Sequence, residues 1–281
     1  MKYLNLDKDF NPFATEADKL IPHQTFVFSG GEPHIKLEAI DLRKEEVMIT
    51  QRINSFEALG LICLAVDALR RMEVAEISLF IPYFPGARQD RVMVPGEPLS
   101  VKIYADLINQ LGLQKVLVFD PHSEVTAALV NQVQVLSNHQ FAAQVIEKIG
   151  EEVLLVSPDG GALKKIYKVS EALGGLPVVE CSKHRDVRTG QLLGFKVFAD
   201  DLQGKTCLIV DDICDGGGTF LGLAKALQEK NAGKIYLAVS HGIFSKGTAA
   251  LTAQFSAIYA TDSFRVVQGI HTLSLQNLLQ K

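Results

Sequence analysis

Tryptophan is absent from the chain, and cysteine is scarce, with only Cys63, Cys181, Cys207 and Cys214. None of these cysteines belongs to a C-x-x-C pair, and three stand in or beside apolar runs. This pattern argues against a disulfide framework or a zinc site and favours reduced thiols, as in proteins of the cytosol.

Long apolar runs are also lacking. No window approaches the ~18 consecutive apolar residues that cross a bilayer, and the N-terminal stretch MKYLNLDKDFNPF has no apolar segment of the signal-peptide kind. Neither sign of charge dominates, because 28 Lys and Arg face 32 Asp and Glu, for a net charge of -4. We therefore expect a soluble, cytoplasmic protein with neither nucleic acid nor a membrane as its partner.

The composition is that of a globular protein with a sizeable core. Hydrophobic residues make up 47% and charged residues 21% of 281 positions. Short β-branched runs alternate with stretches of helical periodicity. Strands are predicted over residues 26–29, 47–53, 77–84, 115–120, 153–157, 177–180, 207–210 and 234–239, and helices over 57–71, 100–112, 161–173 and 219–230.

This alternation of nearly continuous apolar strands with helices predicts an α/β fold, in which mainly parallel sheets are flanked by helices. Ser100 is expected to cap the helix that follows it, and Gly112 to end that helix. The length suits two domains of ordinary size. We place their boundary in the segment between Leu136 and Glu152, which divides the chain into residues 1–143 and 144–281.

The stretch CLIVDDICDGGGTF, from Cys207 to Phe220, is the most informative local pattern. Three consecutive glycines allow backbone N–H groups to turn inward around an anion, with no Cβ in the way. A helix N-terminus beginning near Thr219 adds unsatisfied donors and a positive dipole end, and the threonine hydroxyl adds one more donor. Gly216, Gly217, Gly218 and Thr219 are therefore predicted to bind a phosphate group.

The carboxylates before these glycines suit a different group. Asp211 and Asp212 follow a strand directly, and Asp215 stands at the start of the glycine run. Carboxylates repel a phosphate but accept hydrogen bonds from the vicinal hydroxyls of a ribose. A diol site beside an anion site indicates a phosphorylated ribose. The alternative is a glycine-rich turn without a ligand; the pattern matches neither a Walker loop nor the dinucleotide G-x-G-x-x-G fingerprint.

VDDICDGGGT resembles the ribose-phosphate loop of the type I phosphoribosyltransferase fold, and IPYFPGARQDR, from Ile81 to Arg91, resembles the signature of the ribose-phosphate pyrophosphokinase family. Further segments resemble motifs of this family in the same order along the chain: FSGGE, FDPH, SPDGG, KHR and SHGIF. The resemblance spans roughly residues 26 to 265. It implies two phosphoribosyltransferase-like domains, with ATP bound by the first domain and ribose 5-phosphate by the second.

The activity implied by this resemblance is Mg²⁺-dependent diphosphoryl transfer from ATP to the anomeric hydroxyl of ribose 5-phosphate, which gives phosphoribosyl pyrophosphate and AMP. The implied assembly is a homodimer or hexamer in which the ATP site is shared between subunits. Two alternatives stay open: a phosphoribosyltransferase that consumes phosphoribosyl pyrophosphate, and a non-catalytic regulatory homologue.

The ATP side is predicted on the loop ARQDR. A guanidinium at Arg88 can form forked hydrogen bonds with phosphates, and nearby prolines make the loop rigid. Gln89 and Asp90 belong to the same predicted site. The alternative is a surface loop held by salt bridges.

The adenine contacts follow from the resemblance alone, which assigns them to Phe28, the position of Gly30, and Glu32, supplied by a neighbouring subunit. Without the resemblance, Phe28 would be interpreted as a core residue of a strand. Gly30 stands where the family usually has aspartate, so one expected contact is missing.

Three residues that end apolar strands are candidates for binding Mg²⁺ by resemblance. His122 and Asp159 would hold the ion directly or through water, with Asp120 as a further candidate. Magnesium prefers oxygen ligands and keeps several waters, so a histidine is an unusual partner. The alternatives are a hydrogen-bonded His122 and an Asp159 that caps a helix.

The charged stretch SKHRDVRTG, residues 182–190, has no periodicity. Such a run is usually a solvated loop. It could instead close over the transferring group, stabilise its charge and exclude water. By resemblance Lys183 is the catalytic residue, and Arg185 joins it and contacts ribose 5-phosphate.

Other positions also differ from the family motifs. Gly96 and Pro121 replace the usual arginine and leucine, and Gly216–Gly217 replaces the usual Thr-Ala, which removes one hydroxyl donor while keeping residues small.

Overall fold

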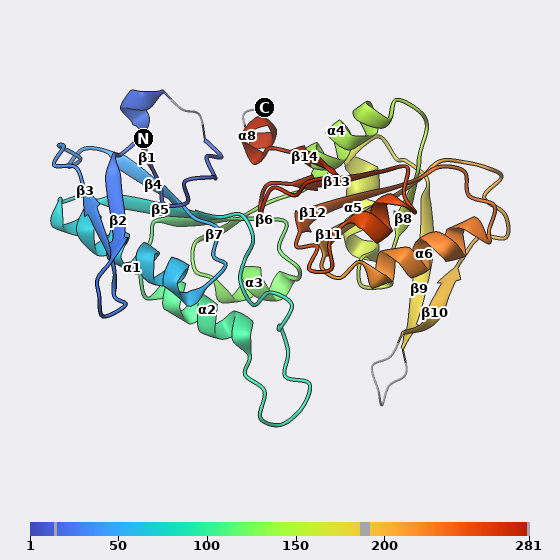
Figure 1. The fold of residues 1–281 in the computed structure, drawn as a ribbon, viewed down its shortest axis with the longest axis horizontal. Helices are drawn as coiled ribbons and strands as arrows, with labels where there is room; N and C mark the ends of the chain where they lie inside the picture. Colours follow the sequence, from blue (N-terminus) through green and yellow to red (C-terminus); the bar gives the residue numbers. More distant parts are fainter. Residues whose placement is uncertain (14–15, 186–191, 280–281) are drawn as a thin grey trace. The chain divides into compact units, whose positions relative to one another are not determined.

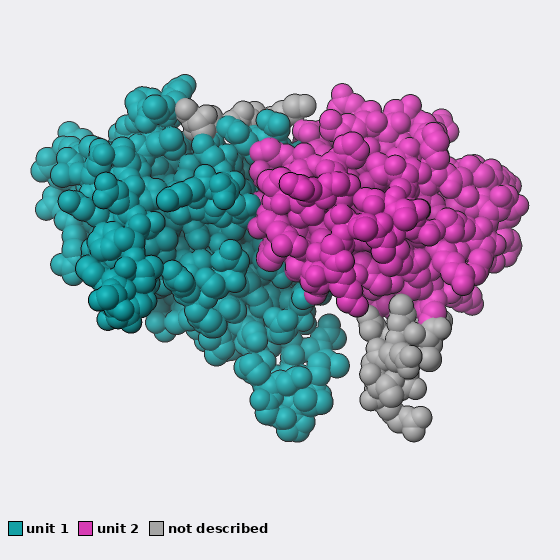
Figure 2. Space-filling model, viewed as in Figure 1, with its two compact units in different colours: residues 1–137, 275–281 teal, residues 138–274 magenta. Residues whose placement is uncertain are grey.

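The computed structural model describes residues 1–13, 16–185 and 192–279, without the side chains of residues 184, 185, 192 and 193. Two compact units divide it (Figure 2): unit 1 contains residues 1–137 and the C-terminal helix α8 (Leu275–Leu279), and unit 2 contains Asn138–Ser274. The predicted boundary after residue 143 would cut helix α4 (His139–Ile149), which buries Phe141 and Val145 on one face. Because a helix packs through a continuous apolar face, the division falls before α4.

Unit 1 is built on a parallel sheet whose described strands follow the order β1-β4-β5-β6-β7. The central strands are buried on both faces, as their nearly continuous apolar sequences predict. The strands are β1 (Lys2–Asn5), β4 (Glu46–Thr50), β5 (Glu76–Ile81), β6 (Lys115–Phe119) and β7 (Val133–Leu136), and the helices are α1 (Phe56–Arg71), α2 (Ser100–Asn109) and α3 (Glu124–Leu129), with a 3-10 turn η1 (Ala17–Lys19).

A separate antiparallel hairpin joins β2 (His23–Val27) to β3 (Pro33–Leu37) in unit 1. The strand predicted over residues 26–29 is therefore displaced, because β2 ends at Val27 and the turn begins at Phe28. The turn is closed by hydrogen bonds from the N–H of Phe28 to the carbonyl oxygen of Glu32 (2.9 Å) and from the N–H of Gly31 to the carbonyl oxygen of Phe28 (2.8 Å).

Unit 2 contains a larger sheet with the strand order β10-β9-β8-β11-β12-β13-β14 in its described part. All neighbouring strands are parallel except the antiparallel pair β9 and β10. The strands are β8 (Leu154–Ser157), β9 (Val178–Arg185), β10 (Leu192–Val197), β11 (Cys207–Cys214), β12 (Ile235–Gly242), β13 (Ala257–Thr261) and β14 (His271–Leu273), and the helices besides α4 are α5 (Leu163–Ala172), α6 (Gly218–Gln228) and α7 (Ala249–Thr252).

Three strands of unit 2 extend beyond their predicted ends: β9, β11, and β12, which continues to Gly242. β9 pairs with β8 only up to Glu180 and continues to Arg185 by pairing with β10 (Figure 1). β11 continues past Val210 because its residues up to Cys214 pair with β12. Cross-strand hydrogen bonds therefore hold charged stretches in extended conformation that sequence periodicity assigned to loops.

The helices are short, and none among the described residues combines the length and apolar character needed to cross a bilayer. Ser100 is not the cap that the sequence predicts: it is the first residue of α2, and Leu99 precedes it without a side-chain cap. The reason is tertiary, since the carbonyl oxygen of Gln89 accepts a hydrogen bond from the N–H of Val101 at 3.4 Å.

The four cysteines are free thiols, as the sequence predicts. Burial raises the pKa of Cys181 and that of Cys214 to about 12, with smaller contributions from neighbouring groups, and burial raises the pKa of Cys207 to about 11. These thiols therefore stay protonated, which keeps them unreactive.

A pair of helical glycines gives a stability test of this fold. A Cβ on Gly222, in α6, would lie 2.6 Å from Cε2 of Phe195 on β10, so Gly222→Ala is expected to lower the free energy of unfolding by about 1–3 kcal/mol through overpacking. On Gly60, in α1, a Cβ would have no neighbour within 4 Å. Gly60→Ala is therefore expected to raise that free energy by about 0.5–1 kcal/mol through helix propensity. Urea denaturation measures both, and equal effects would contradict the packing of β10 on α6.

Candidate functional site

The glycine run forms the predicted connection from strand to helix. β11 ends at Cys214, and Gly217 adopts a left-handed conformation (φ +75°) directly before the first residue of α6, Gly218. A Cβ on Gly217 would lie 2.9 Å from Cδ1 of Leu251. Position 217 therefore requires glycine for two reasons, backbone conformation and close packing. Thr219 lies in the first turn of α6, where helix N–H groups lack partners within the helix.

Asp211 and Asp212 are the fifth and sixth residues of β11, at its carboxyl end. The N–H of Asp212 donates to Oδ1 of Asp211 at 2.9 Å, and Nζ of Lys165, on α5, lies 3.7 Å from Oδ2 of Asp212. Asp211 keeps some exposed surface, yet burial raises its pKa well above the ordinary value, and the charges of Asp212 and Asp159 raise it further. Excess negative charge thus collects at this edge of the sheet.

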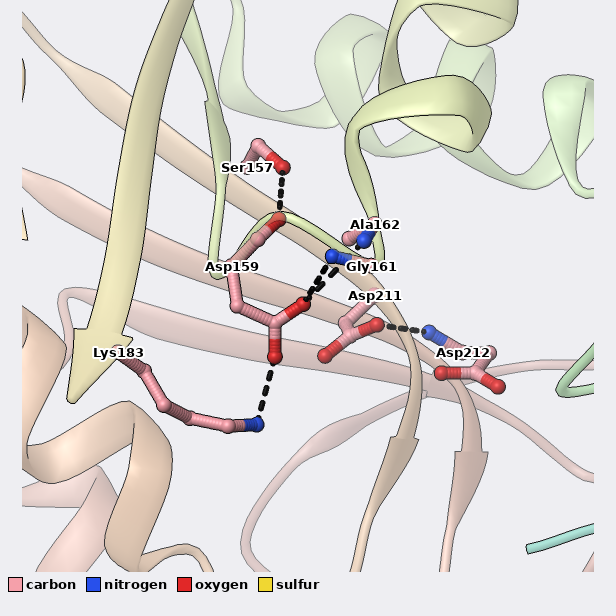
Figure 3. A network of polar contacts seen from close by, with 7 residues as sticks. All are labelled: Ser157, Asp159, Gly161, Ala162, Lys183, Asp211 and Asp212. Atoms are coloured by element: carbon pink, nitrogen blue, oxygen red, sulfur yellow. Dashed lines mark hydrogen bonds and ion pairs between the residues drawn. The ribbon is translucent and has the colours of Figure 1, made fainter. Parts of the chain in front are cut away.

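Asp159 and Lys183 form an ion pair at the same edge of unit 2 (Figure 3). Nζ of Lys183, on β9, lies 2.6 Å from Oδ2 of Asp159, and each side chain keeps about a quarter of its surface exposed (25% and 26%). Oδ1 of Asp159 accepts hydrogen bonds from the N–H groups of Gly161 (2.9 Å) and Ala162 (3.2 Å). One carboxylate therefore closes the turn before α5 and fixes the position of Lys183.

The structure brings together the predicted residues Lys183, Asp159, Asp211 and Asp212, as the labelled side chains in Figure 3 show. Arg185 is the last residue of β9, but its side chain lies outside the described part of the chain, as do residues 186–190 of the predicted lid. The described part of that lid is strand rather than loop, because it pairs with β10.

The raised pKa of Asp211 predicts a cost in stability. In the unfolded chain this carboxyl ionises near its ordinary value of 3.8, whereas the folded protein holds its proton to higher pH. The unfolded state is therefore favoured as pH rises from that value through the raised one. Asp211→Asn, which keeps an acceptor for the N–H of Asp212, should raise Tm by several degrees at pH 7 and by much less near pH 3.

Thermal unfolding followed by circular dichroism at the two pH values measures this difference. Asp200→Asn, at an exposed position, is the matched control and should leave Tm unchanged at both. A Tm for Asp211→Asn that stays at or below the wild-type value at pH 7 would contradict the claim that the charged form of Asp211 destabilises the folded protein.

The ARQDR loop lies in unit 1, after β5. Its conformation depends on Gly86 (φ +68°), where a Cβ would lie 3.0 Å from Cδ2 of Tyr104. Arg88 and Gln89 are exposed, and Asp90 is largely buried beside Arg91, with Nε 3.2 Å from Oδ1. Burial alone would raise the pKa of Asp90, but Ser123, Arg91 and His122 lower it overall. Asp90 is thus a stable anion, while Arg88 and Gln89 face solvent.

The tip of the β2–β3 hairpin carries the predicted adenine-contact residues. Phe28 is 53% exposed and packs edge-on against Phe26, with 5.1 Å between ring centroids. It is not a core residue, contrary to what a strand pattern alone suggests. At Gly30 a Cβ would lie 2.5 Å from Oε2 of Glu32. The Glu32 carboxylate occupies the space next to Gly30 into which a side chain at position 30 would project.

The two metal candidates of unit 1 follow β6. Asp120 is buried at 6% exposure with φ +38°, and its N–H donates to the carbonyl oxygen of Leu136 at 2.9 Å. His122 is exposed. Within the described ranges, no group of three or more His, Cys, Asp or Glu side chains is arranged to hold a metal ion. These residues thus form no preformed cage.

Sequence reasoning missed Lys165. It is the third residue of α5, in the stretch LKKIYK, which contains three lysines, none of which stands out. Only the packing of α5 against the sheet brings its ammonium group to Asp212.

The sheet of unit 2, with paired aspartates on β11 and a glycine turn into α6, defines a protein of the phosphoribosyltransferase fold class. A sequence model for this class, the phosphoribosyl transferase domain, matches residues 131–269, and a model for the N-terminal domain of ribose phosphate pyrophosphokinase matches residues 16–112. The chain belongs to the ribose-phosphate pyrophosphokinase family.

Relatives in sequence support the same family, and a solved structure supports the same fold. The chain is 33% identical to a ribose-phosphate pyrophosphokinase of Mycoplasma pneumoniae, covering 80% of this chain and 69% of that one. It is 32% identical to one of Agrobacterium fabrum, covering 83% and 76%. The crystal structure of phosphoribosylpyrophosphate synthetase from Mycobacterium smegmatis has the same fold, with a TM-score of 0.83 at 24% identity over 99% of this chain and 95% of that one. The predicted family, fold class and enzymatic character are thereby confirmed.

Proposed function

We propose that this enzyme transfers the diphosphoryl group of ATP to the anomeric hydroxyl of ribose 5-phosphate, giving phosphoribosyl pyrophosphate and AMP. The observation that carries the proposal is the edge of the sheet in unit 2, where a lysine–aspartate pair, two further carboxylates and a glycine turn before α6 lie together. Membership of the family supports the same reaction.

Ribose 5-phosphate is assigned to β11 and the turn after it. The 5-phosphate binds at the N-terminus of α6, where N–H groups of the Gly216–Thr219 segment are available to a dianion. Asp211, Asp212 and Asp215 accept hydrogen bonds from the ribose hydroxyls.

ATP is assigned to unit 1. Arg88 and Gln89 are exposed on a loop anchored to α2 and suit the phosphates. Phe28 offers an exposed aromatic face and Glu32 an acceptor, which suit an adenine base brought by another subunit of a homo-oligomer. The missing side chain at Gly30 should weaken discrimination among nucleotides.

Mg²⁺ is the proposed cofactor. This ion commonly takes one or two carboxylates, several waters and substrate phosphates rather than a protein cage, and the crowded carboxylates around Asp211 would be relieved by a divalent cation. Asp159 in unit 2 is one candidate ligand for the ion, and His122 and Asp120 in unit 1 are others, each binding it directly or through water. When bound, it would neutralise charge on the ATP phosphates. Because Lys183 already occupies Oδ2 of Asp159, direct binding there would compete with the lysine.

In the proposed reaction the anomeric oxygen attacks the β-phosphorus of ATP, the bond to the α-phosphate oxygen breaks, and AMP leaves. Catalysis of this kind rests on positioning and charge stabilisation. Lys183 supplies a positive charge from a hydrogen-bonded strand, and Arg185 at the end of β9 is proposed to join it.

The test measures the formation of AMP from ATP by chromatography. Formation that depends on both ribose 5-phosphate and Mg²⁺ supports the proposal. Release of pyrophosphate from phosphoribosyl pyrophosphate with a purine or pyrimidine base, without AMP formation, would assign a phosphoribosyltransferase instead. Binding of ribose 5-phosphate without any turnover would assign a regulatory homologue.

A further inference from the structure

A lysine outside the family motifs lies against the turn that connects β11 to α6 (residues 214–218), which we call the phosphate turn. Lys246 follows β12, and its side-chain carbons run alongside Gly216: a Cβ at position 216 would lie 3.5 Å from both Cδ and Cε of Lys246. The ammonium group is one bond of about 1.5 Å beyond Cε, so it lies within about 5 Å of that point.

The turn that carries Lys246 is fixed to the phosphate turn by backbone hydrogen bonds. The N–H of Phe244 donates to the carbonyl oxygen of Cys214 (3.1 Å), and the N–H of Ser245 donates to that of Asp215 (3.1 Å). The guanidinium of Arg265 donates hydrogen bonds to the carbonyl oxygens of Ile243 and Phe244. The lysine is therefore presented by a rigid turn, although its own side chain is exposed.

The positive charge of Lys246 is suited to binding an anion. Lys246 has no ion-pair partner within the part of the chain that the structure describes. Its neighbour in the phosphate turn is Gly216, which offers an N–H group but no side-chain donor. A Cβ at position 216 would be in ordinary van der Waals contact with the lysine stem.

We propose that Lys246 binds the 5-phosphate of ribose 5-phosphate, supplying from the neighbouring turn the donor that the glycine run lacks. The inference rests on the proposed function, since it assigns a further residue to the phosphate subsite of that reaction. Gly216 and Lys246 then act as a pair: a Cβ at position 216 would already be in van der Waals contact with the stem, and the stem carries a cation toward the helix N-terminus, where a dianion is favoured.

Lys246→Met keeps the stem and removes the charge. It is expected to raise KM for ribose 5-phosphate about tenfold, the size of one charge-assisted hydrogen bond, while kcat, KM for ATP and Tm stay at wild-type values. Lys246→Arg should retain most of the affinity. Lys225→Met, an exposed lysine near the other end of α6, is the matched control and should leave every constant unchanged. A KM for Lys246→Met within twofold of wild type overturns the assignment.

Calorimetry measures sugar binding without turnover, so it tests the role of Lys246 independently of the proposed reaction. Ribose 5-phosphate should bind Lys246→Met about tenfold more weakly than wild type, whereas ribose, which lacks the phosphate, should bind both proteins equally. If the wild-type protein forms no AMP, the proposed function fails, and the binding comparison still decides the role of Lys246. Equal weakening for both sugars would contradict a phosphate contact.

A second variant tests the pairing with Gly216. Gly216→Thr is expected to raise KM for ribose 5-phosphate by displacing the lysine stem, and to have much less effect in a Lys246→Ala background, where the stem is absent. This non-additivity is expected of two side chains in contact. Identical effects of Gly216→Thr in both backgrounds would overturn the packing argument.

Discussion

Lys183→Ala is expected to lower kcat about a thousandfold, as the loss of a cation that stabilises transferring phosphoryl groups does in other enzymes. Lys183 is held on β9 by pairing with β10 and by its 2.6 Å contact with Asp159. Its charge is therefore in place before reaction. Since the pair is partly solvent-exposed, its loss should cost less than about 1 kcal/mol of stability, and the effect should appear in kcat.

Steady-state AMP formation measures this prediction, with KM for ribose 5-phosphate expected within a fewfold of wild type. Lys196→Ala, on the adjacent strand β10 and exposed, is the control and should keep wild-type kcat. Unchanged turnover in Lys183→Ala would remove the lysine from the mechanism. Recovery of part of the rate by Lys183→Arg would support a role for charge.

Gly217→Val is expected to raise KM for ribose 5-phosphate at least tenfold and to lower the free energy of unfolding by about 2–4 kcal/mol. A β-branched residue is strained at φ +75°, and its Cβ would lie 2.9 Å from Leu251. Either the turn changes its backbone conformation, which moves the N–H groups meant for the phosphate, or α7 shifts.

Gly204→Val isolates the backbone strain from the contact. Gly204 has a similar conformation (φ +70°), no neighbour within 4 Å of its missing Cβ, and a place before β11, away from the phosphate turn. It should lose about 1–2 kcal/mol of stability through strain alone and keep its KM. Denaturation gives the free energy of unfolding of both variants, and kinetics give their KM for ribose 5-phosphate. A wild-type KM in Gly217→Val would contradict the proposal that this turn binds the phosphate.

Local patterns were sufficient where neighbours in sequence are neighbours in space. The strand before Asp211, the glycine turn and helix α6 could be predicted because φ preferences, capping and apolar periodicity act over a few residues. The parallel sheets followed from the same alternation of strands and helices.

Pairing between distant segments decided what the sequence could not show. β9 runs to Arg185 because β10 pairs with it, and α2 begins at Ser100 because Gln89 caps it. Phe28 is exposed because it lies in the turn of a two-stranded hairpin rather than in a strand of the main sheet of unit 1.

The amino-acid sequence alone therefore identifies the residues of the family motifs and the class of ligand that they suit. The tertiary structure alone decided where three charged side chains lie: Lys183 against Asp159, Lys165 near Asp212, and Lys246 beside Gly216. The physical reason is that electrostatic energy depends on distance in space, and these partners are brought together by strand order and helix packing, which no local pattern encodes.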